Sequence, residues 1–174
     1  MPSTLKLDKW QNTAGVNYNS ILQVVTATSG FTKQTFASST PVQLTGMSVT
    51  IRPYFANSKI LIMGVVTASW TYVAGVHIYK NLFDIIGSHG SNLQNGGSSS
   101  IWTYYNQGIG AGTGSLRPMS LQYMDTANST NNITYSIYAN SGWNGAAPDT
   151  FYFNTRDTDD MLSSSYLTVM EIAQ

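Results

Sequence analysis

Short runs in which hydrophobic and polar residues alternate recur along most of the chain, a pattern typical of β-strands. Residues 47–52 alternate strictly and stop at Pro53, so Met47, Val49 and Ile51 are expected to point inward. The pattern predicts strands at 21–27, 32–36, 47–52, 58–69, 75–79, 82–86, 100–106, 116–125, 133–138, 150–154 and 163–172. No window shows the period of an amphipathic helix. Strands this short and numerous predict an all-β fold, an antiparallel β-sandwich of the jelly-roll type.

The last predicted strand, 163–172, is hydrophobic on both of its faces. Leu167 and Val169 fall on one face, whereas Tyr166, Met170 and Ile172 fall on the other. Its own domain can cover only one of these faces. Because only two residues follow Ile172, we expect another copy of the chain to cover the second face. The sequence therefore predicts self-association through Tyr166, Met170 and Ile172.

Residues 1–22 show no sustained period and are predicted to form an extended N-terminal arm, followed by one domain at 23–174. Leu5, Leu7 and Trp10 are the hydrophobic residues expected to anchor this arm on a partner surface. The first residues lack the apolar core of a signal peptide. The longest apolar run, 60–66, is too short to span a bilayer.

Charged residues make up only 9% of the chain, against roughly 25% in typical soluble domains. This composition suits a surface that is largely buried in an assembly, or one that forms hydrogen bonds with sugars. The net charge is zero and the basic residues are scattered, so neither nucleic acid nor a membrane is an expected partner. The absence of cysteine excludes disulfides and thiolate catalysis, and suits synthesis in a reducing cytoplasm.

Several blocks of the sequence, taken together, resemble structural proteins of marine bacteriophages and cyanophages. The blocks are 3–8 with 11–15, 45–53 with 58–62, and 153–156 with 167–172. The resemblance implies a virion surface protein made in the host cytoplasm, with a homotrimeric jelly-roll head related in shape to tumour-necrosis-factor-like heads. Such heads occur on tail fibres and as knobs that decorate or cement capsids. The chain has no shaft, which favours a knob fixed by its arm to the major capsid protein or another virion protein.

One acidic turn is a candidate cation site. Asp157, Asp159 and Asp160 lie within four residues and offer oxygen ligands of the kind that bind Ca²⁺. The turn lacks the glycine and the distal glutamate of the twelve-residue calcium loop. We therefore favour a solvated turn and predict neither a metal nor a cofactor.

Catalytic constellations are absent from the sequence. His77 falls in an apolar strand and His89 in a Gly/Ser-rich loop, and no nucleophile or metalloprotease motif accompanies them. Asp125 and Asp149 are carboxylates of the type that a glycosidase uses, but nothing singles them out as a pair. The sequence predicts a protein that is not an enzyme, and the resemblance supplies no catalytic residues.

A group of aromatic residues offers the remaining candidate binding surface. The group comprises Trp70, Tyr72, Trp102, Tyr104, Tyr105 and Trp143. Packing in the core and between subunits is the favoured interpretation for most of them. Trp143 lies in the loop 141–145, where it has little core to join, so it is a candidate contact for a glycan together with Trp102 and Tyr104. The alternative function is therefore a fibre tip that recognises a host-surface polysaccharide.

Overall fold

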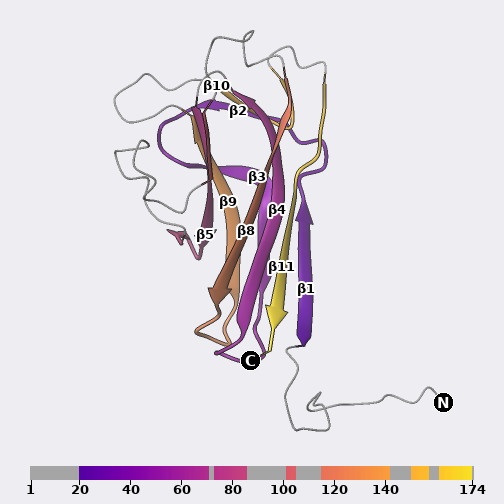
Figure 1. Ribbon diagram of the computed structural model, residues 1–174, viewed down its shortest axis with the longest axis vertical. Helices are drawn as coiled ribbons and strands as arrows, with labels where there is room; N and C mark the ends of the chain where they lie inside the picture. Colours follow the sequence, from indigo (N-terminus) through magenta and orange to yellow (C-terminus); the bar gives the residue numbers. More distant parts are fainter. Residues whose placement is uncertain are drawn as a thin grey trace, which may run out of the picture.

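The structure is a computed structural model that describes residues 20–70, 73–85, 101–104, 115–141, 150–156 and 161–173, with the backbone alone at 73 and 101–104. Within these ranges every regular element is a β-strand, as the alternating sequence pattern predicts (Figure 1). The strands are β1 (Ile21–Thr28), β2 (Gln34–Ala37), β3 (Val42–Ile51), β4 (Lys59–Trp70), β5 (Val73–Lys80), β6 (Phe83–Asp84), β7 (Ile101–Tyr104), β8 (Arg117–Thr126), β9 (Ile133–Ser141), β10 (Thr150–Phe153) and β11 (Tyr166–Ile172).

The strands form two antiparallel sheets. The first sheet has the order β1-β11-β4-β10-β2, and β8 pairs with the other edge of β4. The second sheet has the order β3-β9-β5-β6, with β7 also paired to β5. Along β1, β3, β4, β5, β7, β8, β9 and β11 the chain crosses repeatedly between the two sheets, which is the path of a jelly roll. The predicted fold class, an all-β antiparallel sandwich, is confirmed.

The core lies between the sheets and is built from one face of each strand. On β4, Ile60, Ile62 and Val66 are fully buried, while Leu61, Met63 and Val65 are only partly buried. Leu167 and Val169 of β11 also point inward and are fully buried, as predicted. Side chains alternate across a strand, and on β1, β8, β11 and residues 59–67 of β4 those of the other face are partly buried or exposed.

The start of β3 differs from the sequence prediction. The strand begins at Val42, whereas the strict alternation indicated a start at Met47. A register shift in the pairing with β9 lies between Gln43 and Ser48, and Gly46 within it has a φ of 80°. Because an irregularity of this kind interrupts the two-residue period, the alternation is visible only after it.

Candidate functional site

The side of the first sheet that faces away from the core is a candidate contact surface. We call it the outer face. It consists of Val24, Thr26 and Thr28 from β1; Tyr166, Thr168, Met170 and Ile172 from β11; Leu61, Met63 and Val65 from β4; and Ser120, Gln122 and Met124 from β8. Figure 1 shows β8, β4, β11 and β1 side by side, with no described element lying across them.

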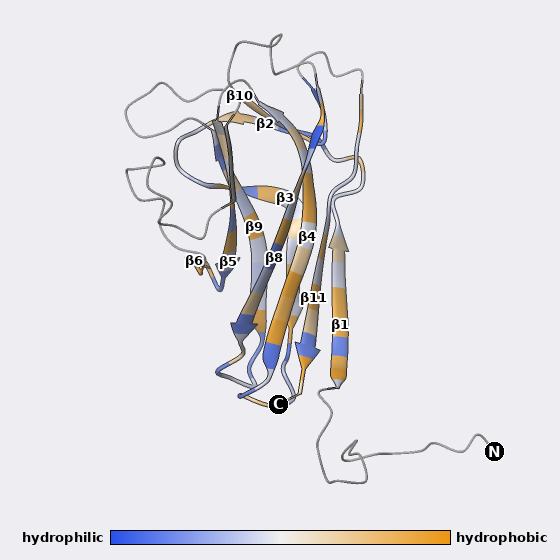
Figure 2. Ribbon diagram, in the orientation of Figure 1, coloured by the Kyte–Doolittle hydropathy of each residue, from blue (hydrophilic) through white to orange (hydrophobic). Residues whose placement is uncertain are grey.

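Hydrophobic side chains cross the outer face in a continuous row. Val24, Met170, Leu61 and Met124 are register partners on four adjacent strands. Val24 is 51% exposed and Met124 is 49% exposed, while Met170 and Leu61 are partly buried by their neighbours. Figure 2 shows the hydrophobic character of β4 and β1 on this sheet. The apolar area of this row is removed from water only when another surface packs on it.

Lys59, at one end of β4, is the single charged residue among the described positions of the outer face. It is the register partner of Ile172, and its ammonium donates a hydrogen bond to Thr126 Oγ1 at 2.9 Å. The other polar residues of the face are threonine, serine, glutamine and tyrosine. Burial of the row Val24, Met170, Leu61 and Met124 against a protein surface therefore requires no desolvation of an ionised group within the row.

The three residues predicted to mediate self-association lie together on the outer face. Tyr166 is 51% exposed, and Met170 and Ile172 are partly buried. The predicted strand 58–69 contains the apolar run 60–66, which accounts for Leu61 and Met63. Met124 was not singled out because it follows mostly polar positions in its own strand; only the pairing of β8 with β4 places it in the row.

A buried carboxylate shapes the end of the molecule where β1 begins. Glu171 is fully buried and accepts hydrogen bonds from Gln23 Nε2 at 2.6 Å, from the Tyr54 amide at 2.8 Å and from the Phe55 amide at 3.3 Å. Gln23 Nε2 also donates to the carbonyl of Arg52 at 2.7 Å. Neither ion pair found in the described residues involves this carboxylate, so these hydrogen bonds offset its burial. They fix the loop that follows β3.

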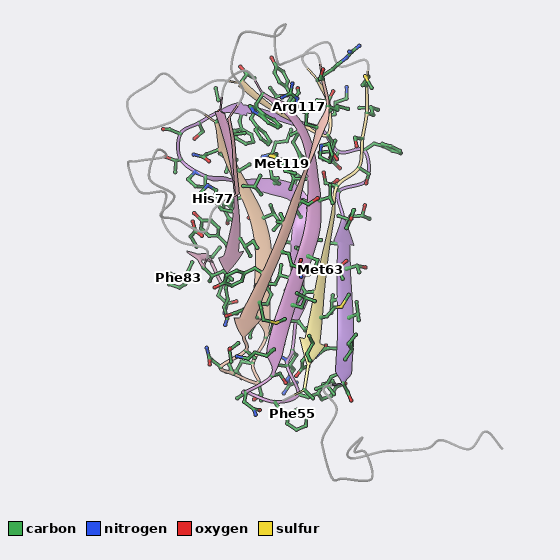
Figure 3. All side chains as sticks on the ribbon, in the orientation of Figure 1. Phe55, Met63, His77, Phe83, Arg117 and Met119 are labelled. Atoms are coloured by element: carbon green, nitrogen blue, oxygen red, sulfur yellow. The ribbon has the colours of Figure 1, made fainter. Side chains whose placement is uncertain are left out.

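The loop held by Glu171 exposes two aromatic side chains. Tyr54 is 67% exposed and Phe55 is 54% exposed, and Figure 3 shows Phe55 projecting from the lower end of the molecule. Ile21, the first residue of β1, is 60% exposed at the same end. These three side chains are exposed at the end of the molecule where the described part of the chain begins.

His77 is a buried structural residue. Its Nδ1 lies 3.0 Å from Asp84 Oδ2, and its Nε2 lies 3.1 Å from Asn140 Oδ1. Asn140 Nδ2 donates to the carbonyl of Ser39 at 3.0 Å, which fixes the orientation of the amide. The imidazole is 0% exposed and therefore does not face solvent, where a substrate would bind. It connects β5, β6, β9 and the loop before β3.

Asp125 takes part in a network that joins the two sheets. Its Oδ2 accepts a hydrogen bond from the hydroxyl of Tyr135 at 2.7 Å and lies 2.7 Å from the ammonium of Lys80. Lys80 also donates to the carbonyls of Thr126 and Ala127. Burial, together with the hydrogen bond to Asp125, raises the pKa of Tyr135 above its usual value. This carboxylate is engaged in holding β5, β8 and β9 together.

The Tyr135 hydroxyl is expected to make stability depend on pH at the alkaline end. In the unfolded chain this tyrosine ionises near 10.0, whereas its pKa is raised in the folded protein. Above that pH the unfolded state binds fewer protons, so the free energy of unfolding falls as the pH rises. Tyr135→Phe is expected to reduce the slope of this fall and to cost about 1–3 kcal/mol at neutral pH, because Asp125 loses a donor. Urea denaturation from neutral pH to about pH 11 measures both effects, and equal slopes in the two proteins would contradict the assignment.

The remaining predicted site residues are distributed as follows. Trp70 is buried, with the Arg117 guanidinium 5.7 Å from its ring centroid, in accord with a packing role. Trp102 and Tyr104 lie two residues apart on β7, where only the backbone is described. The residues outside the described ranges are Leu5, Leu7, Trp10, Tyr72, His89, Tyr105, Trp143, Asp149, Asp157, Asp159 and Asp160.

Neither a metal-binding cluster nor a membrane-spanning helix is found among the described residues. No group of three or more acidic, histidine or cysteine side chains is arranged there to hold a metal ion. None of the described segments is a helix of the length and hydrophobicity needed to cross a bilayer.

Comparisons with known proteins return neither a matching family model nor a matching curated protein. Among solved structures, the chain is similar to the infectious bursal disease virus Gt strain structure, with a TM-score of 0.44 and 17% identity over 100% of this chain and 43% of that chain. It is also similar to the T=1 particles derived from infectious bursal virus, with a TM-score of 0.45 and 14% identity over 99% of this chain and 42% of that chain. The chain thus spans less than half the length of these proteins. Likenesses at this level carry no argument about function.

Proposed function

We propose that this chain is a non-enzymatic virion structural protein, a homotrimeric surface knob that decorates or cements a phage capsid through its N-terminal arm, residues 1–22. The observation that carries this proposal is the hydrophobic outer face, charged only at Lys59 on its margin, which nothing in the described part of the chain covers. Other copies of the chain are the partners that cover it. Jelly rolls serve as building blocks of many viral coats, and the sequence resemblance supports a place on a phage particle.

Assembly through the outer face has a sufficient physical driving force. Apolar area removed from water contributes about 25 cal/mol per Å². The row Val24, Met170, Leu61 and Met124 places four large side chains next to one another, and Tyr166 and Ile172 extend it along β11. The low proportion of charged residues lowers the desolvation cost over the rest of such an interface.

The end of the molecule where β1 begins is the end that we assign to attachment. β1 begins there at Ile21, and Tyr54 and Phe55 are exposed at the same end. Leu5, Leu7 and Trp10 of the arm would bind the major capsid protein or another virion protein. Attachment here leaves the opposite end, where β2 and β10 lie, directed away from the particle.

Two measurements test the proposed function. Sedimentation equilibrium of the purified protein is expected to give three times the chain mass at micromolar concentration, and a folded monomer would contradict the proposal. Electron microscopy of particles carrying a tagged copy of the protein is expected to show density at regular positions on the capsid. Density confined to the tail would instead favour the alternative function.

The alternative is a fibre tip or receptor-binding module that recognises a host-surface glycan. It is favoured by the two-residue spacing of Trp102 and Tyr104 on β7, which places both residues on one side of that strand. Trp143 would complete such a site. A glycan array comparing the unmodified protein with Trp143→Ala distinguishes the functions, because only a glycan-binding tip gives signals that the variant loses.

A further inference from the structure

A closed trimer needs two different surface patches on each copy. Around a threefold axis each copy contacts one neighbour through one patch and the other neighbour through a second patch. The outer face supplies one of these patches under the proposed function, on which this inference rests. The second patch must be hydrophobic, exposed and located on another side of the same molecule.

The turn between β5 and β6 meets these conditions. Leu82 is 79% exposed and Phe83 is 75% exposed, the two highest values among the large hydrophobic residues of the described chain. We call these two residues the hairpin tip. They project from the second sheet, whereas the outer face belongs to the first.

Hydrogen bonds hold the hairpin tip in place. Asn81 pairs with Thr134 of β9 twice, since its amide donates to the Thr134 carbonyl and its Oδ1 accepts from the Thr134 amide, both at 2.8 Å. After the tip, Asp84 contacts buried His77 at 3.0 Å, and the Ile85 amide donates to the Ile78 carbonyl at 3.0 Å. The backbone of the tip therefore has little conformational freedom left to lose on binding.

The backbone of the tip is strained for the residues that it contains. Asn81 has a φ of 48° and Leu82 a φ of 72°, in the left-handed region. Asparagine adopts this region readily, but leucine does so rarely, and glycine is the usual residue at such a position. Strain of this kind is characteristic of functional positions. A leucine here exposes a large apolar side chain at the cost of a less favourable turn.

The hairpin tip and the outer face lie at the same level of the molecule. Figure 3 shows Phe83 projecting from one side at nearly the same position along the long axis as Met63 on the outer face. If the threefold axis is parallel to the long axis of the molecule, rotation from one copy to the next changes the direction in which a residue points. It does not change the position of the residue along that axis. The Phe83 side chain of one copy therefore arrives at the level of Met63 in the next copy.

We propose that the hairpin tip of each copy packs on the outer face of its neighbour, against the hydrophobic residues around Met63. The row Val24, Met170, Leu61 and Met124 lies beside Met63 on the same strands and supplies the surface that receives Leu82 and Phe83. The hydrophobic row has no charged residue, and Leu82 and Phe83 bring none to it. The three interfaces of the ring are then identical.

Substitution of the tip tests this interface directly. The double change Leu82→Ser and Phe83→Ser is expected to raise the dissociation constant of the assembly by at least roughly 30-fold, the effect of removing an interfacial hot spot. Its circular dichroism spectrum and urea midpoint are expected to stay those of the unmodified fold, because both side chains are exposed. Phe31→Ser, which alters a phenylalanine that is 70% exposed elsewhere, is the matched control and should leave the assembly intact.

Leu82→Gly separates an interface role from a role in folding. Glycine removes the side chain but suits the φ of 72° better than leucine does. We expect a fold at least as resistant to urea as the unmodified protein, together with weaker assembly. A trimer with unchanged affinity in Leu82→Gly and in the double serine variant would overturn the inference while leaving the proposed trimer in place. An unmodified protein that is monomeric would overturn the proposed function itself.

Cross-linking identifies which residues meet. The chain contains no cysteine, so Phe83→Cys and Met63→Cys introduce the sole thiols. With a short bis-maleimide reagent, the protein carrying both changes is expected to give covalent trimers on a denaturing gel, whereas each single variant gives none. Covalent trimers absent from the double variant, with sedimentation still showing a trimer, would place the hairpin tip outside the interface.

Discussion

Met170→Asp is expected to convert the proposed trimer into folded monomers. Met170 lies inside the hydrophobic row of the outer face, between its register partners Val24 and Leu61. A carboxylate at this position stays hydrated in the monomer but loses its water when a neighbour packs on it, which costs several kcal/mol. The dissociation constant is therefore expected to rise at least about 1,000-fold, equivalent to about 4 kcal/mol. Sedimentation over a concentration series measures the change.

The matched control for Met170→Asp introduces the same charge elsewhere. Thr40 is exposed in the turn between β2 and β3, and only its backbone atoms form the hydrogen bonds found there. Thr40→Asp should leave the mass of the assembly unchanged. Circular dichroism should show the same strand content in both variants. An intact trimer of Met170→Asp with unaltered affinity would show that the outer face is not the contact surface.

Among the substitutions proposed, Gly64→Ala is expected to lower the free energy of unfolding of the single chain most. Gly64 lies in β4, opposite Leu167 of β11. A Cβ atom at this position would meet the backbone oxygen of Tyr166 at 2.6 Å and Leu121 Cδ1 at 3.4 Å. The backbone of β11 cannot turn aside as a flexible side chain can, so the two strands must separate. We expect the free energy of unfolding to fall by about 3 kcal/mol, as in overpacked cores.

Urea denaturation compares Gly64→Ala with a glycine change that meets no obstacle. Gly30 has a φ of 56°, and an added Cβ there would have no atom within 4 Å. Gly30→Asn is the control, because asparagine accepts this backbone conformation; its urea midpoint should change little. A Gly64→Ala midpoint equal to that of the control would contradict the close pairing of β4 with β11.

Local pattern explains which parts of the fold could be predicted. The alternation in β8, β9 and β11 places each strand and each inward face correctly, because burial of one face selects the residues at every second position. The surface formed by several strands depends on register, which no single strand encodes. Met124 shows this limit, since it joins the hydrophobic row only through the pairing of β8 with β4.

Two further features have no local signal in the sequence. Glu171 interacts with Tyr54 and Gln23, which lie more than a hundred residues before it in the chain. The short strand β6 was predicted as part of a longer strand at 82–86, because Leu82, Phe83 and Ile85 are hydrophobic. In the structure Leu82 and Phe83 are exposed at a turn, so their hydrophobicity reflects a surface and not the core. Hydrophobic residues alone do not distinguish these two cases.

The hydrogen bonds of Glu171 also affect when the protein becomes competent to attach. The loop that displays Tyr54 and Phe55 is synthesised early. The hydrogen bonds to Glu171 that fix it form only after residue 171 has left the ribosome. Nascent and prematurely terminated chains therefore lack the fixed loop. A carboxylate in the last strand of the sandwich thus delays maturation of the proposed docking end until β11 has been made.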